Sequence, residues 1–335
     1  MLKIPCIYFP TTVMLIDDNL SVLENLSLNL DVRLPVKLHQ YPEQALRQLQ
    51  SQLASPSINA DFMKIYSSEF TDGEDALLKV NFDAIRRLLY NPNRFSQVTA
   101  IVVDHSMPKL TGLELCHRIK NSPVKKIMLT GEAGPHMAID AFNQGVIDQF
   151  IVKATPDMQS RLQNSIKAAQ WNYFLSISES ILTAIESQAD CALREVTYQN
   201  MVKQYFLTHS PCEFYLIDLT GSFLFIDDHG RPSWMIVRSE EELLSYYEIA
   251  NDYAQSEKIP ADILQNLKER KAIPFFFSEE DYKLPIRAWK RYMHSAQPLP
   301  GNNRFYVSII REDQQYDIHK AHIKSYNDYL STLEG

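Results

Sequence analysis

The sequence contains few of the residues that build disulfide-linked, zinc-binding or phosphate-cradling domains. Its four cysteines, Cys6, Cys116, Cys191 and Cys212, are scattered over 335 residues and form no CxxC pair. This excludes a disulfide framework and a cysteine zinc cluster, and it predicts a reducing compartment. With only nine glycines, the chain has neither a glycine-rich phosphate loop nor the elbow that carries a nucleophilic serine.

Long apolar runs and an excess of positive charge are also missing. No stretch approaches the roughly 18 uninterrupted apolar residues of a membrane span, and prolines and acids interrupt the apolar start of the chain. We therefore expect a cytoplasmic protein. The net charge of −8 and the pI of about 5.6 exclude a global attraction to nucleic acid or to an anionic membrane. The length is sufficient for two domains.

In the first half of the chain, short apolar runs alternate with helical patterns. Leucines at 20, 23, 26 and 30, for example, have helical spacing. The runs that we interpret as strands cover residues 13–16, 36–41, 98–103, 126–130 and 149–153. Five alternations of strand and helix predict a doubly wound five-stranded parallel sheet with helices on both faces.

Residues 54–97 do not follow this alternation of strands and helices. A structureless loop of that length is unusual in a compact domain, so we expect an ordered insertion. Its apolar positions suit one or two added helices and are Leu77, Val80, Phe82, Ile85 and Leu88.

Beyond residue 154 the pattern changes. Residues 155–188 have no glycine and no proline after Pro156, and apolar residues recur at intervals of three or four. This predicts either one long connector helix, able to form a two-stranded coil, or two ordinary amphipathic helices. Residues 213–239 read as three strands joined by turns, followed by helices near 239–255 and 260–271, strands at 272–277 and 304–312, and a closing helix at 319–333. A C-terminal α+β domain with a small antiparallel sheet is expected.

Acidic, hydroxyl and basic residues end four of the predicted parallel strands. Asp17 and Asp18 follow the first strand and Asp104 ends the third, while Thr130 ends the fourth and Lys153 the fifth. Such strand ends meet at one edge of a doubly wound sheet. Three carboxylates there repel one another unless a cation lies between them, and Mg²⁺ suits a site with so few carboxylates. Taken singly, the aspartate pair could be a helix cap, and Lys153 a surface lysine.

Together with Met107, Pro108 and Gly112, which follow Asp104, this pattern resembles the receiver domain of two-component response regulators. The resemblance implies a flavodoxin-like fold with Asp104 as the phosphorylated residue. It implies that Asp17, Asp18, Asp104 and the backbone carbonyl of Ser106 hold Mg²⁺. Thr130 and Lys153 would contact the phosphoryl group, and Phe150 would be the switch aromatic. The phosphodonor would be a sensor histidine kinase or a phosphotransfer protein.

Two departures from the family stand out. Asp18 and Asp104 are 86 residues apart (104 − 18), about twice what a simple receiver needs, and the insertion accounts for this. Ala154 stands where the family usually has a proline, which removes no catalytic group. Since every acidic, hydroxyl and lysine position is intact, we expect a receiver that is phosphorylated. The inserted receiver and unassigned second half also resemble those of a quorum-sensing response regulator.

The second half carries no effector signature. Its basic residues, interleaved with aromatics, are Lys268, Arg270, Lys271, Arg287, Lys290 and Arg291. They could form a DNA-reading surface or a nucleotide site, although such runs are more often solvated faces.

We therefore expect a receiver at 1–154, with the insertion at about 54–97, a connector helix at 155–190 and an output domain at 191–335. The function expected is a response regulator in which phosphorylation controls dimerisation. Its output is expected to act by protein or ligand contact, and its only chemistry is its own phosphorylation and dephosphorylation. The alternatives are a DNA-binding regulator using residues 265–295 and an output that binds or converts a nucleotide.

Overall fold

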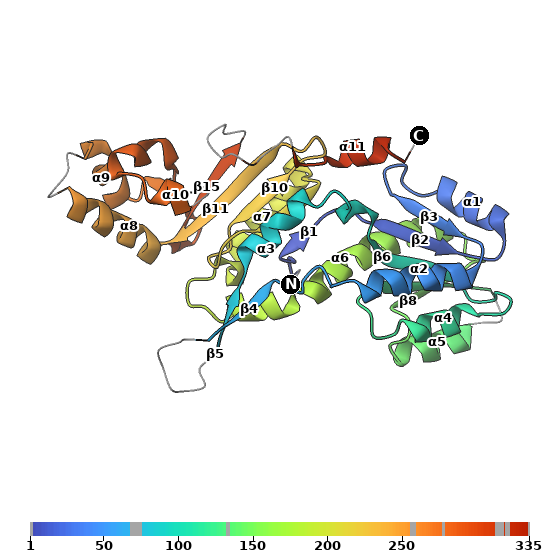
Figure 1. Cartoon of the computed structure of the whole chain (residues 1–335). Coiled ribbons are helices and arrows are strands. Elements are labelled where there is room, and N and C mark those ends of the chain that lie inside the picture. Colours follow the sequence, from blue (N-terminus) through green and yellow to red (C-terminus); the bar gives the residue numbers. More distant parts are fainter. Residues whose placement is uncertain are drawn as a thin grey trace. The chain divides into compact units, whose positions relative to one another are not determined.

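The computed structural model describes residues 3–67, 76–131, 135–254, 259–276, 279–311, 318 and 322–333. Contacts divide the chain into two units (Figure 1). Unit 1 comprises Met1–Ser180 and Tyr326–Gly335, and unit 2 comprises Ile181–Ser325. The chain thus leaves unit 1 inside a helix and returns to it at Tyr326. No described helix is long and apolar enough to cross a membrane.

A parallel five-stranded sheet forms the centre of unit 1, as the alternation of strands and helices predicts. In spatial order its strands are β3 (Val36–His39), β2 (Thr12–Ile16), β6 (Val98–Asp104), β7 (Lys125–Thr130) and β8 (Gln149–Val152). All neighbours pair in parallel. The central strand β6 is buried along its whole length, which explains why its sequence is apolar on both faces.

Helices cover both faces of this sheet. One face packs against α1 (Leu20–Leu28) and α6 (Met158–Glu186), the other against α2 (Pro42–Ala54), α4 (Gly112–Arg118) and α5 (Pro135–Asn143). Alternate residues of β6 serve the two cores. Helix α6 is one continuous helix rather than two, and Leu162, Ile166 and Ala169 fix its first half to the sheet.

The insertion differs from its prediction in its first half. Residues 63–67 and 76–80 form an antiparallel hairpin, β4 (Met63–Ser67) and β5 (Ala76–Val80), so Leu77 and Val80 lie in a strand. Their three-residue spacing fits a helix, but pairing between the two segments overrides it. Helix α3 (Phe82–Arg87) and two 3₁₀ turns, η1 (Leu88–Tyr90) and η2 (Arg94–Ser96), then lead into β6.

Unit 2 contains the antiparallel sheet expected for the second half. Its strands in spatial order are β9 (Glu213–Leu216), β10 (Phe223–Ile226), β11 (Pro232–Ser239), β15 (Asn302–Arg311) and β14 (Gln297–Leu299). A separate pair joins β12 (Ala272–Pro274) and β13 (Met293–Ser295). The helical elements are η3 (Ala192–Arg194), α7 (Val196–His209), α8 (Glu240–Tyr253), α9 (Ala261–Lys268), α10 (Glu279–Tyr282) and η4 (Ile286–Tyr292).

Two short elements of unit 1 lie near the ends of the chain. They are β1 (Ile7–Tyr8) and α11 (Tyr326–Ser331). The closing helix expected at 319–333 is shorter than predicted, since residues 323–325 are not helical, and residues 319–321 lie outside the described part.

The start of α4 lies directly against the end of β6. Thr111 caps the helix, and its side chain and that of Glu114 satisfy each other's backbone N–H groups. A Cβ atom at Gly112 would lie 2.1 Å from the backbone oxygen of Asp104. Only glycine permits this approach, which explains its position eight residues after Asp104.

We predict that Gly112→Ala destabilises the protein by about 1–3 kcal/mol, because the added methyl group must displace backbone. Urea unfolding of the full chain measures this. The matched control is Gly131→Ala, where nothing lies within 4 Å of the added Cβ. Equal stability of the two variants would contradict the close approach.

Candidate functional site

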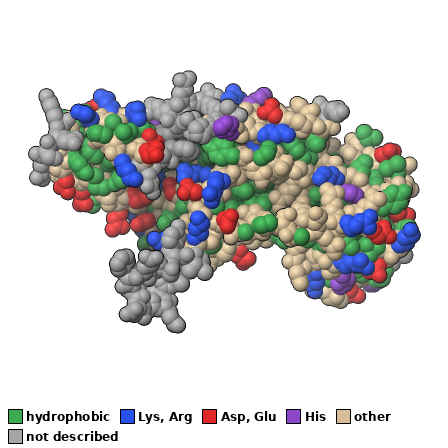
Figure 2. Space-filling model, in the orientation of Figure 1, with side chains coloured by type: hydrophobic (Ala, Val, Ile, Leu, Met, Phe, Trp, Pro, Cys, Tyr) green, Lys and Arg blue, Asp and Glu red, His purple; other side chains and the backbone are tan. Residues whose placement is uncertain are grey.

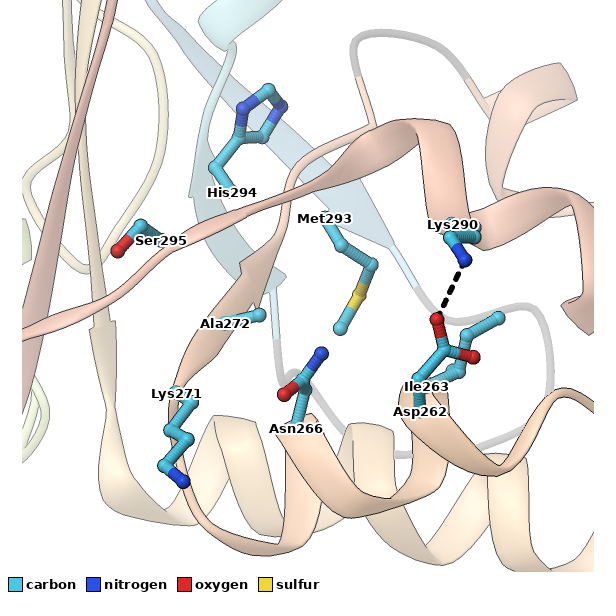
Figure 3. Close-up of a pocket in the computed structure, with 9 residues that line it drawn as sticks. All are labelled: Asp262, Ile263, Asn266, Lys271, Ala272, Lys290, Met293, His294 and Ser295. Atoms are coloured by element: carbon cyan, nitrogen blue, oxygen red, sulfur yellow. Dashed lines mark ion pairs between the residues drawn. The ribbon is translucent and has the colours of Figure 1, made fainter.

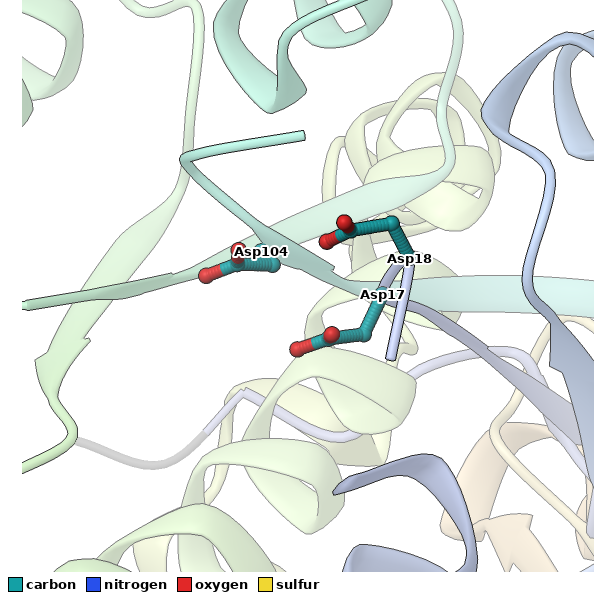
Figure 4. Close-up of side chains that lie close together, drawn as sticks. All are labelled: Asp17, Asp18 and Asp104. Carbon is teal, nitrogen blue, oxygen red and sulfur yellow. The ribbon is translucent and has the colours of Figure 1, made fainter. Parts of the chain in front are cut away.

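Three carboxylates meet at the carboxyl edge of the parallel sheet. Asp17 and Asp18 follow β2, and Asp104 is the last residue of the neighbouring strand β6. One oxygen atom from each lies within 4.8 Å of the others, and Figure 4 shows the three side chains directed at one small volume. Asp17 and Asp104 are buried, whereas Asp18 is exposed. Sheet topology thus assembles the site from residues far apart in sequence.

The aspartate pair does not cap the helix that follows it. Asn19 is the N-cap of α1, and its side chain accepts hydrogen bonds from the backbone N–H groups of Ser21 and Val22. The backbone N–H of Asn19 in turn donates to Oδ1 of Asp17 at 2.9 Å. This leaves Oδ2 of Asp17 and the carboxylate of Asp18 available for other contacts. The N-cap interpretation of the pair is therefore wrong.

Lys153 supplies the positive charge of the cluster. It directly follows β8, and its Nζ lies 3.0 Å from Oδ2 of Asp17 and 2.8 Å from Oδ1 of Asp104. Burial of the ammonium group opposes its charge, but the hydrogen bonds and charges of the two aspartates outweigh burial. The pKa of Lys153 therefore lies above its ordinary value.

Thr130 and Ser106 border the cluster. Thr130 ends β7, is fully buried and donates its hydroxyl hydrogen to the backbone oxygen of Gly131 at 3.2 Å. The backbone N–H of Lys153 donates to the oxygen of Thr130, which joins the two strand ends. Ser106 lies in the exposed turn after β6, and its backbone N–H donates to Oδ2 of Asp104 at 3.2 Å. Phe150, in the middle of β8, is half-buried against the core beneath α2, α4 and α5.

The donor set of this cluster suits a hard divalent cation. It offers oxygen atoms only, and it carries three formal negative charges against the single positive charge of Lys153. Mg²⁺ binds through one or two carboxylates and keeps several waters, so the exposed position of Asp18 is compatible with it. Asp17, Asp18 and Asp104 are thus the residues that could hold a metal ion.

The basic residues of unit 2 do not form a free cationic surface. Arg270 pairs with Glu240 at 2.7 Å, Lys271 with Glu269 at 2.5 Å and Lys290 with Asp262 at 2.6 Å. The guanidinium of Arg291 donates to the hydroxyl of Tyr292, which itself donates to Asp281. Among the described residues, Lys268 and Arg287 have no ion-pair partner. On the face shown in Figure 2, Lys and Arg side chains are interspersed with Asp and Glu side chains.

A cavity of about 330 Å³ lies beside Lys290 but does not have the composition of a nucleotide site. Its walls come from α9, β12, η4 and β13, and Asp262 already neutralises Lys290 at its rim. Figure 3 shows Met293 and Asn266 facing each other across the cavity, while the side chain of His294 extends away from it. Among the described residues, the lining includes neither Arg287 nor Arg291 and no Phe, Tyr or Trp side chain.

Unit 2 contains a buried ionic network that the sequence pattern does not reveal. Arg238 ends up almost fully buried, and its Nη1 donates to Oδ2 of Asp218 at 2.7 Å. Glu242 accepts hydrogen bonds from Thr220 and from the backbone of Ser239, and burial raises the pKa of its carboxyl group. The network joins the β9–β10 turn to the start of α8. The S-x-x-E pattern of Ser239 and Glu242 is a local signal for the helix cap that they form. Only the tertiary fold brings Asp218 and Thr220 to Arg238 and Glu242, and no local pattern indicates those contacts.

Comparison with known proteins agrees with this geometry. Residues 65–167 match the family described as response regulator receiver domain. The structure of the response regulator LqsR of Legionella pneumophila matches with a TM-score of 0.78 and 30% identity, over 99% of this chain and 96% of that one. No curated protein matched the chain in sequence.

Two other similar structures cover only about half of the chain. An adenylate cyclase from Rhodopirellula baltica matches at 21% identity over 52% of this chain and 98% of that one, with a TM-score of 0.35. A response regulator receiver domain protein from Clostridium thermocellum matches at 19% identity over 48% and 94%, with a TM-score of 0.32. Neither adds to the assignment. The full-length match, the receiver match and the aspartate cluster place this chain among the response regulators that carry a receiver domain.

Proposed function

We propose that the chain is a switch of a two-component phosphorelay, phosphorylated on Asp104 by a histidine kinase or a phosphotransfer protein. One observation carries this proposal. The buried carboxylate of Asp104 lies beside two further carboxylates and 2.8 Å from the ammonium group of Lys153. A carboxylate held in this way is a nucleophile next to the charges needed to accept a phosphoryl group.

The proposed transfer needs little covalent chemistry. A carboxylate oxygen of Asp104 forms a bond to the phosphorus of a phosphohistidine as the phosphorus–nitrogen bond breaks, and the released imidazole nitrogen takes up a proton. Lys153 then neutralises part of the new charge, and the Thr130 hydroxyl donates to a phosphoryl oxygen. Hydrolysis of the acyl phosphate returns the carboxylate and releases inorganic phosphate.

The aspartates would hold Mg²⁺ in the working protein. Asp17, Asp18, Asp104 and the backbone carbonyl of Ser106 are the proposed ligands. When bound, the ion neutralises charge on the phosphoryl oxygens. Asp17 is positioned for this by the N–H of Asn19, and Asp18 by its place at the solvent-facing side of the site.

Phosphorylation is proposed to control dimerisation through α5. The hydroxyl of Thr130 must leave Gly131 to reach a phosphoryl group, and half-buried Phe150 on the adjacent strand can respond. Beyond this strand pair, α5 exposes the apolar side chains of Ile139 and Phe142, which are three residues apart and therefore neighbours on the helix surface. We propose these two side chains as the dimer contact.

The output unit is proposed to act by protein or ligand contact, in a quorum-sensing relay. The ion pairs of Arg270, Lys271 and Lys290 count against a DNA-reading surface, since each pair must break before the cation contacts phosphate. The composition of the cavity beside Lys290 counts against a nucleotide-converting output. The proposed chemistry is thus confined to phosphorylation and dephosphorylation of Asp104.

Asp104→Asn should abolish phosphorylation, because the amide is not a nucleophile. Incubation with acetyl phosphate and Mg²⁺ followed by intact-mass measurement detects the added phosphoryl group. Asp157→Asn, an exposed aspartate outside the site, is the control and should be labelled like the wild type. Undiminished labelling of Asp104→Asn would refute the proposal.

Lys153→Met should destabilise the protein by roughly 2 kcal/mol, because two buried carboxylates lose their counter-charge. The effect is smaller than for a fully buried ion pair because the lysine side chain is partly exposed to solvent. Since folding raises the pKa of Lys153, this contribution is complete below the ordinary lysine pKa and is lost as pH rises through the folded-state value. Added Mg²⁺ should recover part of the loss in thermal unfolding. Lys290→Met, at an exposed pair, should change stability by less than about 0.5 kcal/mol. Equal effects would contradict the assigned geometry.

Phe142→Ala should weaken a beryllofluoride-induced dimer roughly tenfold or more, because it removes the aromatic ring of the proposed contact. Light scattering with and without beryllofluoride measures the change. Leu28→Ala is the control, since Leu28 is even more exposed, 83% against 51% for Phe142, but belongs to α1. A dimer that survives Phe142→Ala and dissociates with Leu28→Ala would move the interface to another face.

A further inference from the structure

The insertion and the C-terminal helix, neither of which the phosphorylation site uses, meet each other in unit 1. Phe95 lies in η2, the last turn of the insertion before β6, and its side chain is fully buried. Its ring centroid lies 5.1 Å from that of Tyr326 and 5.3 Å from that of Tyr329, both in α11. Helix α11 therefore packs against the last turn of the insertion.

Hydrogen bonds and a cation–π contact also hold α11 in place. We call the residues that receive it, Thr12, Arg33 and Phe95, the cradle. The hydroxyl of Tyr326 donates to the backbone oxygen of Arg33, whose guanidinium carbon lies 5.6 Å from the Tyr326 ring centroid. Arg33 also donates to the side-chain oxygen of Asn327 at 3.2 Å. The hydroxyl groups of Tyr329 and Thr12, the first residue of β2, lie 3.4 Å apart.

The cradle lies at the opposite edge of the sheet from Asp104. Thr12 begins β2 and Phe95 lies just before β6, whereas the aspartate cluster is at the carboxyl ends of these two strands. Contacts between the rings of Phe9 and Phe95 (82° between planes) tie the cradle to the core independently of α11. We therefore expect the surface that receives α11 to keep its structure when the helix undocks.

Helix α11 depends on this surface for its own structure. It has only six residues, and a helix of that length does not form alone in water. Its buried side chains are Tyr326 and Tyr329, and the residue between them that faces Arg33 is polar. Docking and helix formation are therefore one event, and undocking is a local unfolding step that leaves the sheet intact.

We propose that α11 is a detachable clasp and that η2 with Arg33 is its docking site, so that the insertion serves to hold the C-terminal segment on the receiver. Unit 2 lies between Ser180 and Tyr326 in the chain and is held at both ends when α11 is docked. Release of α11 removes the attachment at the C-terminal end of unit 2. This inference does not depend on phosphorylation of Asp104.

Hydrogen exchange of the full-length protein tests whether the helix opens on its own. We expect amides of 326–331 to exchange as a group, at least roughly 100-fold faster than those of β6. The double variant Tyr326→Ala/Tyr329→Ala should accelerate exchange at 33–34 and 94–96 and leave β6 unchanged. Ser331→Ala, an exposed position of the same helix, should behave as the wild type. Accelerated exchange throughout β2 and β6 would show that α11 is part of the core and overturn the proposal.

A second experiment tests the docking site directly. A fluorescein-labelled synthetic peptide of residues 322–335 should bind the full-length double variant, whose cradle is vacant, with at least roughly tenfold higher affinity than wild type, where α11 competes. Fluorescence anisotropy measures both. The same peptide with both tyrosines changed to alanine should not bind. Equal binding to the two proteins, or binding to neither, would refute a detachable clasp.

Discussion

The electrostatic repulsion between neighbouring carboxylates is the constraint on which the arrangement of the site in unit 1 depends. Asp17 and Asp104 are buried within reach of each other, an arrangement that persists only because Lys153 contacts both. The parallel topology sets this arrangement, since β2, β6 and β8 all end at the same edge. The three aspartates and Lys153 thus lie at the end of a strand or directly after one. The backbone hydrogen bond between Lys153 and Thr130 extends the network to β7.

The parallel sheet and its acidic edge were predictable because buried parallel strands have a distinctive sequence pattern. They read as short continuous apolar runs, and a charge such as Asp104 at the end of one marks where the chain reaches the sheet edge. Local patterns also located β9, β10 and β11, where turn residues separate apolar runs. In both cases the information lies within a few neighbouring residues.

Features decided by distant partners were not predictable. Leu77 and Val80 have a spacing compatible with a helix, and only pairing with 63–67 makes them strand residues. From the sequence, the basic residues of unit 2 could bind a phosphate group. The fold, however, brings Glu240 to Arg270 and Asp262 to Lys290, and these carboxylates neutralise them. The same holds for Arg238 and Asp218. Pairing of charges is a tertiary property that one-dimensional periodicity does not encode.

The return of the chain to unit 1 at Tyr326 has a consequence for biosynthesis. Residues 326–331 cover Phe95, yet they are translated after all of unit 2. On the ribosome the receiver sheet forms early, but the aromatic surface at Phe95 stays uncovered while unit 2 emerges. The final packing of the first unit therefore comes after the synthesis of all of unit 2, and a nascent chain stalled before Tyr326 would present this apolar surface to chaperones.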